Sequence, residues 1–307
     1  MRGGRVGRAR RRGWLSGDAM AGRRGVLRPS SLRLKDGRRI RFPAVTAVLN
    51  VTPDSFSDGG LYLDARRAVE RGLELAAAGA DIVEVGAEST RPGAAAVAVE
   101  EELARLVPVL EGLGSRLKVP ISVDTRKAEV ARRALALGAA VVNDVSGLRF
   151  DPAMAAVAAQ AKAAVVLMHM RGTPATMGRM ARYRDVVAEV KSELAARARM
   201  AVRCGIRADR ILLDPGFGFA KKAADNLKLL RGLPQLCRLG YPIMVGVSRK
   251  RFLRRIAGSA DAALSGATLA ASLLAVLAGA SLVRVHEPGP AAAALKVVRA
   301  WRALGAV

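Results

Sequence analysis

Residues 120–144 read PISVDTRKAEVARRALALGAAVVND, and this stretch holds the repeating unit of the fold. A short apolar run, Pro120–Val123, is followed by a helical pattern over Lys127–Leu137 and by a second apolar run, Val141–Asn143. Gly138 stands just after the helical pattern, where a glycine in the left-handed conformation commonly ends a helix. Short, nearly continuous apolar runs are typical of parallel strands that are covered on both faces. The stretch is therefore predicted to form one strand–helix–strand unit.

The same unit recurs from about Phe42 to the end of the chain. The predicted strands are Val45–Leu49, Ile82–Val85, Pro120–Val123, Val141–Asn143, Ala164–Met168, Ile211–Leu213, Ile243–Val245 and Leu282–Val285. The predicted helices include Ala65–Ala78, Glu100–Gly112, Lys127–Leu137, Tyr183–Cys204, Ala262–Leu277 and Pro290–Arg302. Eight strands in strict alternation with helices predict an α/β fold, a single-domain (β/α)8 TIM barrel over residues 31–307. An open, doubly wound sheet is the alternative.

The positive charge is concentrated near the N-terminus. The 307 residues carry a net charge of +25, and residues 1–41 hold 14 Lys and Arg but only two acidic residues. No apolar periodicity precedes Val26, so we expect residues 1–30 to form a basic, disordered extension. Residues added by a start upstream of Met20, an organelle transit peptide or an arm that binds nucleic acid are the alternatives, and we do not expect nucleic acid as a partner.

The remaining bulk properties favour a cytoplasmic protein that does not enter a membrane. Two cysteines far apart, Cys204 and Cys237, suit a reducing compartment, and no apolar core of a secretory signal follows the N-terminus. The charge-free run Ala262–Val283 is the one candidate membrane span. Its Ala, Gly and Ser content and Gly279 near its end favour a buried helix, a turn and an inner strand instead.

Polar side chains follow every predicted strand. Because the C-terminal ends of barrel strands meet at one face, residues at these ends are expected to converge there. The residues in these positions are Asn50, Glu84, Glu88, Thr90, Arg91, Asp124, Asn143, Asp144, His169, Asp214, Ser248, Arg249, Lys250, Arg284 and His286. A polar residue after one strand would mean little, but the full set predicts one polar site at the mouth of the barrel.

One group within this set suits a flat heterocycle. Its members are hydrogen-bond acceptors and one cation: Asp124, Asn143, Asp214 and Lys250. A carboxylate can accept two parallel N–H bonds from an amidine-like edge of such a ring. Asp124 and Asp214 would serve equally well as helix N-caps, since each precedes a helix or turn.

A second group suits an anion. It combines cations with neutral donors: Asn50, Thr90, Arg91, Arg284 and His286. Arginine binds phosphate in bidentate fashion, and the last loops of a barrel often hold phosphate. Considered one at a time, an arginine at a strand end is more often the partner of a surface ion pair.

Eight short segments resemble, in order and spacing, those of the dihydropteroate synthase family over roughly Phe42 to Trp301. They read LNVTPDSFSDGG from Leu49, EVGAESTRPG from Glu84, ISVDT from Ile121, NDV from Asn143, LMHM from Leu167, LDPGFGF ending at Phe219, SRK from Ser248 and RVH from Arg284. The first two are highly specific, whereas NDV and RVH alone would be weak. The resemblance implies an enzyme that joins 6-hydroxymethyl-7,8-dihydropterin diphosphate to p-aminobenzoate, releases diphosphate and uses Mg²⁺.

The resemblance also implies roles for individual residues. The pterin would be held by Asp124, Asn143, Asp214 and Lys250, in a slot lined by Met168 and Phe219 with room left by Gly246. The diphosphate would be bound by Thr90, Arg91, Arg284 and His286, with Asn50 as a ligand of Mg²⁺. Catalytic roles fall to Asp124, Lys250 and Arg284. The loops Val51–Gly60 and Glu88–Ala96 would close over the site, and the enzyme would be a homodimer that packs through its last helices.

Three positions depart from the family's common pattern. Glu84 stands where aspartate is usual, Ala87 where glycine is usual, and Arg251 where many relatives carry serine. The aminobenzoate carboxylate is expected near the helix that starts after Lys250, so Arg251 leaves that contact open. The alternative activity is that of a methyltetrahydrofolate-dependent methyltransferase, whose related barrel would explain the pterin group but not the anion group.

Overall fold

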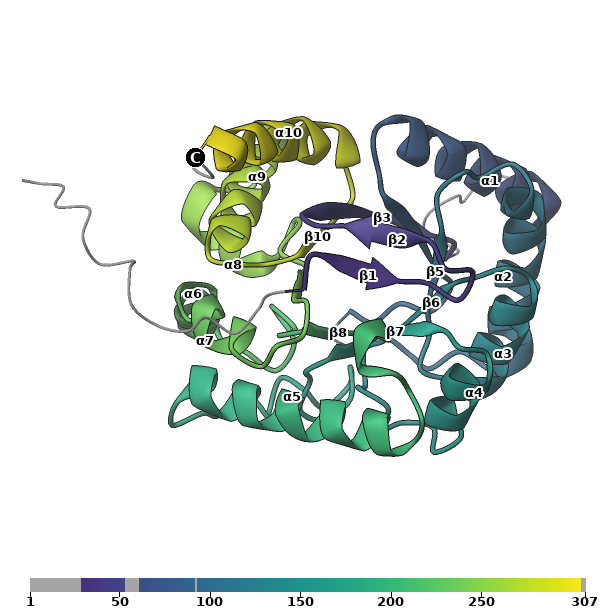
Figure 1. Ribbon diagram of the computed structural model, residues 1–307, viewed down its shortest axis with the longest axis horizontal. Helices are drawn as coiled ribbons and strands as arrows, with labels where there is room; N and C mark the ends of the chain where they lie inside the picture. The colour runs from purple at the N-terminus through teal and green to yellow at the C-terminus, as the bar shows by residue number, and fades with distance from the viewer. Residues whose placement is uncertain (1–28, 53–60, 92, 305–307) are drawn as a thin grey trace, which may run out of the picture.

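The computed structural model describes residues 29–52, 61–91 and 93–304 (Figure 1). The basic extension predicted over residues 1–30 lies outside the described residues except for its last two. Most of the predicted closing loop Val51–Gly60 also lies outside them. These two predictions therefore stay predictions.

Eight parallel strands form the centre of the molecule. They are β3 (Ala44–Asn50), β4 (Ile82–Gly86), β5 (Ile121–Asp124), β6 (Val141–Asp144), β7 (Ala164–Met168), β8 (Ile211–Asp214), β9 (Met244–Val245) and β10 (Leu282–Val285). They follow one another in the order β8-β7-β6-β5-β4-β3-β10-β9, and every neighbouring pair is parallel. A parallel bridge between Leu213 and Ile243 joins the two ends of this order. The sheet therefore closes on itself, the predicted TIM barrel is confirmed, and the open doubly wound sheet is excluded.

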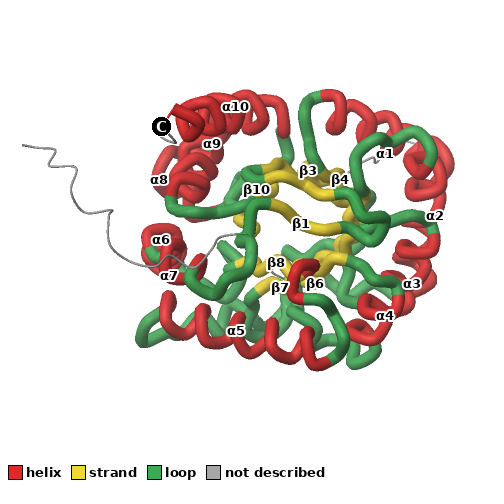
Figure 2. The backbone as a smooth tube through the Cα atoms, viewed as in Figure 1, coloured by secondary structure: helices red, strands yellow, loops and turns green. Residues whose placement is uncertain are grey.

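The helices surround the barrel on the outside (Figure 2). They are α1 (Leu61–Ala77), α2 (Val99–Gly114), α3 (Ala128–Ala136), α4 (Met154–Gln160), α5 (Val186–Arg203), α6 (Ala223–Arg231), α7 (Leu233–Cys237), α8 (Arg251–Ala257), α9 (Asp261–Leu277) and α10 (Pro288–Leu304). The helix expected from Tyr183 begins three residues later. Asp185 is its N-cap and accepts hydrogen bonds from the amides of Val187 and Ala188, which fixes the start of α5. The glycine ends are confirmed, since Gly79, Gly138 and Gly279 have φ of +101°, +104° and +111°.

The run Ala262–Val283 forms the predicted helix, turn and inner strand, but the helix is buried on one side only, since Leu274 and Leu277 are exposed. It contains α9, a turn at Gly279 and the start of β10. Among the described residues, no single helix is both long and apolar enough to cross a membrane. Helices α8 and α9 satisfy that test only as a pair, and they are bent by 113° relative to each other.

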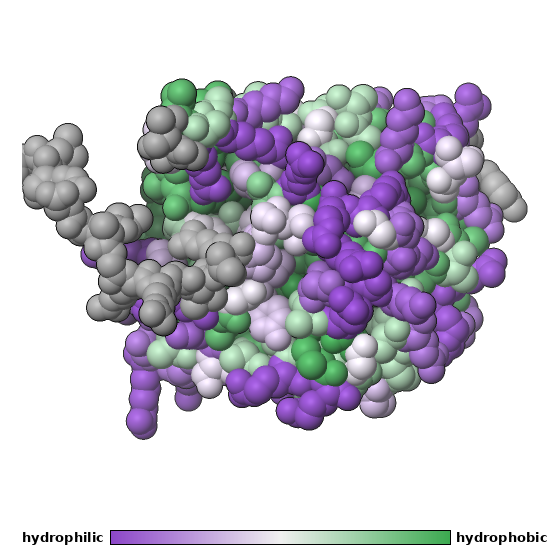
Figure 3. All heavy atoms as spheres, viewed as in Figure 1, coloured by the Kyte–Doolittle hydropathy of each residue, from purple (hydrophilic) through white to green (hydrophobic). Residues whose placement is uncertain are grey.

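A short antiparallel hairpin, which the sequence analysis did not predict, covers one end of the barrel. Its strands β1 (Ser31–Arg33) and β2 (Arg39–Arg41) pair in register, and Gly37 supplies the positive φ of the turn. Leu32, Leu34 and Ile40 are buried in one apolar cluster together with the first residues of the barrel strands. Figure 3 shows hydrophilic residues gathered over the outer face of this hairpin. The hairpin closes the N-terminal end of the barrel, so a ligand must enter from the C-terminal end.

Candidate functional site

On each barrel strand, every second side chain points into the barrel. Successive side chains on a strand point to opposite faces, so alternate residues share one face. The closed lower interior is lined by residues including Ile82, Glu84, Ser122, Leu212 and Leu282. The next inward positions toward the C-terminal end are Asp124, Asn143, Met168, Asp214, Gly246 and Arg284. Five of these residues are expected around the heterocycle and Arg284 is expected to bind the anion, so the two groups adjoin in the same part of the interior.

Asp124 and Asn143 present buried acceptors without donors. The two residues are partners in the register of β5 and β6, and only 9% and 3% of their surfaces are exposed. Oδ1 of Asp124 and Oδ1 of Asn143 have no hydrogen-bond partner among the described residues. A buried acceptor left unpaired costs about 1–3 kcal/mol. Two such oxygens side by side indicate a ligand that brings N–H donors.

Asp214 ends β8 and is not a helix cap. Its Oδ1 accepts a hydrogen bond of 2.7 Å from the amide of Gly216, which fixes the first turn of the following loop. The N-cap of α6 is Lys222 and the N-cap of α3 is Lys127. The alternative reading of Asp124 and Asp214 as helix N-caps is therefore wrong, and both carboxylates remain available to the site.

Burial disfavours the charged form of both carboxylates. Burial, and then the nearby carboxylate of Glu84, raise the pKa of Asp124 to about 8, while Arg284 opposes the shift. Burial also raises the pKa of Asp214 to about 6. Groups whose pKa is shifted in this way by a dry environment are typical of binding and catalytic sites. A ligand that donates hydrogen bonds would stabilise the charged form of each.

Arg284 lies between two carboxylates instead of pointing freely to the mouth of the barrel. Its Nε donates to Oε1 of Glu84 at 2.6 Å, and its Nη2 donates to Oδ2 of Asp124 at 3.1 Å. Glu84 also accepts a hydrogen bond of 3.4 Å from the hydroxyl of Ser122. Glu84 is not among the residues that the resemblance implies for ligand binding. The signal that would have found it is the strand period, since Glu84 and Arg284 both face inward on strands that flank β3.

Cations converge around His286, as the anion group requires. His286 follows β10, and its Nδ1 lies 2.9 Å from the hydroxyl of Ser248. Its pKa is lowered to about 4, first by burial and then by the positive charges of Arg284, Arg249, Lys250 and Arg91. His286 is therefore neutral at pH 7 and lies in a positive electrostatic field.

The loop after β4 is anchored by a buried ion cluster. Glu88 accepts hydrogen bonds from Nη2 of Arg126 at 2.9 Å and from Nζ of Lys127 at 2.8 Å. The cluster fixes the point from which the loop leaves the barrel, just before Thr90, which is half-buried, and Arg91, which is exposed. The structure therefore places Thr90 and Arg91 on an anchored loop, and the charge of Arg91 is the smallest of those that lower the pKa of His286.

The predicted slot residues lie around Lys250. The ammonium group of Lys250 lies 4.2 Å from the centre of the Phe219 ring, a cation–π contact. Burial lowers the pKa of Lys250 to about 8. Met168 is buried in an apolar cluster against which Phe219 packs. A Cβ atom on Gly246 would lie 3.6 Å from Cδ of Arg284, so the space beside this glycine adjoins the arginine stem.

Asn50 is the candidate metal ligand. It ends β3, is half-buried and pairs in register with Gly86 of β4. Within residues 29–52, 61–91 and 93–304, no three His, Cys, Asp or Glu side chains gather as a metal site. Mg²⁺ usually keeps several waters and uses one or two protein ligands together with substrate phosphates. A single amide oxygen fits a Mg²⁺ ion that arrives with a diphosphate, and not one that the protein holds alone.

Comparison with known proteins gives consistent matches over the barrel. A family model described as pterin binding enzyme matches residues 46–286. The dihydropteroate synthase of Mycobacterium leprae is 50% identical over 264 residues, which cover 84% of this chain and 93% of that protein. The dihydropteroate synthase of Synechocystis is 45% identical over 260 residues, which cover 84% and 90%.

Solved structures of the same kind superpose closely. Dihydropteroate synthase of Xanthomonas albilineans with 4-aminobenzoic acid matches with 47% identity and a TM-score of 0.82, covering 90% of this chain and 99% of that one. The same enzyme in complex with 7,8-dihydropteroate matches with 44% identity and a TM-score of 0.79, with the same coverage.

Proposed function

We infer, from the premise that the chain belongs to the dihydropteroate synthase family of pterin-binding enzymes, that it joins 6-hydroxymethyl-7,8-dihydropterin diphosphate to p-aminobenzoate. The products are 7,8-dihydropteroate and diphosphate. The observation that carries this inference is the pair of buried, unpaired acceptors on Asp124 and Asn143 at the open end of the barrel. The relatives and the cations around His286 do not favour the methyltransferase alternative.

The pterin ring is proposed to bind at the group of acceptors. Asp124 and Asn143 accept hydrogen bonds from the N–H groups of the pyrimidine edge, which removes the cost of their unpaired oxygens. Oδ1 of Asp214 is already engaged by Gly216, so its second oxygen faces the ligand. Lys250 donates to a ring acceptor from its place against Phe219. Met168 and Phe219 bound the ring on its apolar faces.

The diphosphate is proposed to bind where the cations converge. Arg91, Arg284 and His286 oppose the charge that develops as the bond between the pterin methylene carbon and the diphosphate oxygen breaks. Mg²⁺, with Asn50 as one ligand, would withdraw negative charge from the departing group. Asp124 and Asp214 offset the positive character of the methylene carbon, which the electron-rich dihydropterin also stabilises.

The nitrogen of p-aminobenzoate then forms the new bond to the methylene carbon and loses a proton. An aryl amine is unprotonated at neutral pH, so the step does not need a strong base. The carboxylate of p-aminobenzoate is proposed to lie near the start of α8, which begins at Arg251 directly after Lys250. Arg251 is exposed and supplies a positive charge there in place of a hydroxyl.

A homodimer is proposed through α9 and α10. These neighbouring helices expose large apolar side chains: Leu274, Leu277, Val297, Trp301 and Leu304. Trp301 is 63% exposed and Val297 is 69% exposed. Hydrophobic residues are also visible at the surface over α8 and α9 in Figure 3. A patch of this kind supports burial against a second copy.

Asn143→Leu tests the observation that carries the inference. This change removes the unpaired oxygen and keeps the volume, so the affinity for 6-hydroxymethylpterin should fall about 10- to 100-fold, equivalent to about 1–3 kcal/mol. Affinity for inorganic diphosphate should stay within about twofold, since Asn143 belongs only to the pterin group. Unchanged pterin affinity in calorimetric titrations would contradict the role of Asn143.

A further inference from the structure

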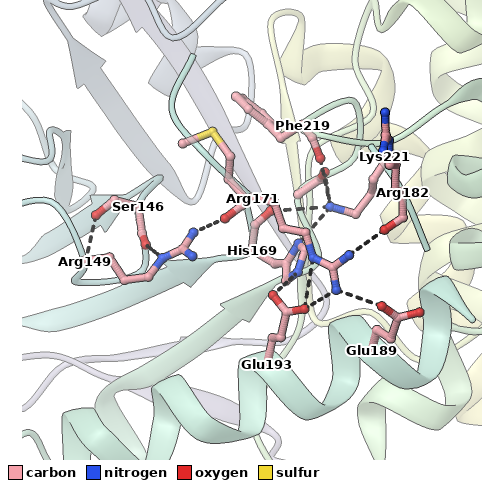
Figure 4. Close-up of polar contacts among 11 residues, drawn as sticks. Ser146, Arg149, His169, Arg171, Arg182, Glu189, Glu193, Phe219 and Lys221 are labelled. Atoms are coloured by element: carbon pink, nitrogen blue, oxygen red, sulfur yellow. Dashed lines mark hydrogen bonds and ion pairs between the residues drawn. The ribbon is translucent and has the colours of Figure 1, made fainter. Parts of the chain in front are cut away.

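Lys221 is a buried lysine that the reaction outlined above does not use, and burial lowers its pKa to about 7. Only 8% of its surface is exposed, and it lies in the loop between β8 and α6. Its Nζ lies 3.0 Å from Nδ1 of His169, from the carbonyl oxygen of Gly216 and from that of Phe219, and 3.4 Å from the carbonyl oxygen of His169 (Figure 4). A lysine in such a place links its neighbours, because its one Nζ contacts Nδ1 of His169 and carbonyl oxygens of two separate segments.

The chain of contacts continues from Lys221 to α5. Nε2 of His169 lies 3.0 Å from Oε2 of Glu193, which stands on α5. Glu193 also accepts hydrogen bonds from Arg171, and Arg171 lies over the ring of Tyr183 at 4.1 Å. Figure 4 shows His169, Arg171 and Glu193 pointing toward one another between α5 and the loop that carries Phe219 and Lys221. The loop is thereby connected to an outer helix through polar side chains.

The neutral state of His169 decides which atoms donate and which accept along the contacts from Lys221 to Glu193. Burial lowers the pKa of His169 to about 4, so the ring is neutral at pH 7. The carboxylate of Glu193 only accepts, so Nε2 of the neutral ring carries the hydrogen that it donates to Glu193, and Nδ1 is left as the acceptor for Nζ of Lys221. The hydrogen bond from His169 contributes most to lowering the pKa of Glu193, to about 2, so Glu193 is charged.

The loop that Lys221 holds has an unfavourable backbone. Gly216, Gly218 and Ala220 have φ of +69°, +81° and +47°. The left-handed conformation costs roughly 1–2 kcal/mol for a residue that is not glycine, so Ala220 needs support from its surroundings. A Cβ atom on Gly216 would lie 2.0 Å from the carbonyl oxygen of His169, so this loop packs directly against the end of β7. Lys221 binds both backbones at this contact.

Three pterin-binding side chains depend on this loop. The amide of Gly216 donates to Asp214, and the carbonyl oxygen of the same residue accepts from Lys221. The carbonyl oxygen of Phe219 accepts from Lys221, and its ring carries the ammonium group of Lys250 at 4.2 Å. Lys221 is therefore bonded to the backbone beside Asp214 and at Phe219, and Phe219 in turn contacts Lys250.

We propose that Lys221, held by His169 and Glu193, is a positioning residue that keeps Asp214, Phe219 and Lys250 in the arrangement that binds the pterin ring. The proposal rests on the function inferred above and adds a specific cause for the geometry of the pterin site. Lys221 does not touch the substrate, so its effect falls on pterin affinity and turnover. The diphosphate group, on the β4 and β10 side of the barrel, does not depend on it.

Lys221→Met, with Lys228→Met as its matched control, tests the proposal. Methionine keeps the apolar stem and removes the donors, whereas Lys228 is an exposed residue of α6. We expect the dissociation constant for 6-hydroxymethylpterin to rise at least tenfold in Lys221→Met, with that for inorganic diphosphate within twofold. Lys228→Met should match the wild type in both. Unchanged pterin affinity in Lys221→Met, or a parallel loss of pterin and diphosphate affinity, would overturn the proposal.

A second pair of variants separates positioning from general packing. The side-chain amide introduced by His169→Gln can accept a hydrogen bond from Lys221 and donate one to Glu193. The side chain introduced by His169→Leu can do neither. We expect His169→Gln to retain pterin affinity within about threefold and His169→Leu to lose it as Lys221→Met does. Equal pterin affinities in His169→Gln and His169→Leu would overturn the role of the contacts that link Lys221, His169 and Glu193. If the wild-type protein does not bind the pterin at all, the proposed function fails together with the positioning role. If the wild type binds the pterin and Lys221→Met binds it equally well, only the positioning role fails.

Discussion

The guanidinium group of Arg284 on β10 donates a hydrogen bond of 2.6 Å from Nε to Oε1 of Glu84 on β4. The two strands flank β3, so this contact crosses the inside of the barrel. Glu84 is 1% exposed, and Arg284 is the cation nearest to it and to Asp124. Glu84 therefore holds Arg284 beside the pterin acceptors, at the border between the pterin group and the diphosphate group.

Glu84→Gln should destabilise the fold. Removing one partner of a buried ion pair costs roughly 3–5 kcal/mol, because the other charge stays buried without compensation. Asp124 still pairs with Arg284, so we expect the lower end, about 3 kcal/mol, in the free energy of unfolding by urea. Glu101→Gln is the control, since its surface pair with Arg105 is worth no more than about 1 kcal/mol. Equal losses in the two variants would contradict the role of Glu84.

Asp124→Asn should leave the fold intact and reduce catalysis. The amide keeps the shape but cannot carry the charge that the N–H donors of the bound pterin stabilise on the carboxylate, and hydrogen bonds to charged groups contribute about 1.5–3 kcal/mol. The value of kcat/KM for the pterin diphosphate should fall about 10- to 100-fold. Near-normal turnover with an unchanged circular dichroism spectrum would remove Asp124 from the site.

The same variant should change how stability depends on pH. The folded state raises the pKa of Asp124 to about 8, so the folded protein binds this proton more tightly than the unfolded chain does. The carboxyl group therefore favours folding most below the unfolded pKa of about 4, and this contribution is lost as pH rises toward 8. In the absence of ligands, the Tm of Asp124→Asn minus the Tm of the wild type should increase as the pH rises from 5 to 8. A difference in Tm that does not vary with pH would contradict the raised pKa.

Arg284→Lys should weaken diphosphate binding. Lysine keeps the charge between Glu84 and Asp124, but it cannot make two parallel hydrogen bonds to a phosphate. We expect the dissociation constant for inorganic diphosphate to rise about tenfold, equal to about 1.4 kcal/mol. Arg231→Lys, an exposed position at the end of α6, is the control and should change nothing. An unchanged diphosphate affinity in Arg284→Lys would refute the assignment.

Trp301→Glu should disrupt the proposed homodimer. A charge in the middle of the exposed apolar surface of α9 and α10 would have to be desolvated on association. Sedimentation velocity should show a dimer for the wild type and a monomer for the variant. Phe150→Glu, at an exposed position in the loop before α4, should leave the dimer intact. A wild-type monomer at micromolar concentration would contradict the proposal.

The strands were predictable because the barrel buries both of their faces. Each forms a short apolar run that ends in a polar residue, and the boundaries agree to within one or two residues. The hairpin was missed because its strands have three residues each and stand among arginines. Leu32 and Leu34 alternate with polar residues before Asp36-Gly37, and Ile40 follows it, which does carry a hairpin signal. The charged residues on the outer face of the hairpin make this segment similar in composition to the basic N-terminal extension, and this similarity hides the alternation.

The site was predictable as a set of residues but not as a set of contacts. Positions at strand ends converge in any barrel, which is how Asp124, Asn143 and Asp214 were found. The pairing of Arg284 with Glu84 depends on side-chain length and on the register of three strands, which local patterns do not encode. Lys221 resembles any loop lysine in the sequence, and only the fold brings it to His169.

Diphosphate release on mixing the purified protein with the pterin diphosphate, Mg²⁺ and p-aminobenzoate tests the central claim most directly. We predict release that depends on p-aminobenzoate, with an equal amount of 7,8-dihydropteroate formed. A well-folded protein that released no diphosphate under these conditions, or released it without forming dihydropteroate, would contradict the assignment.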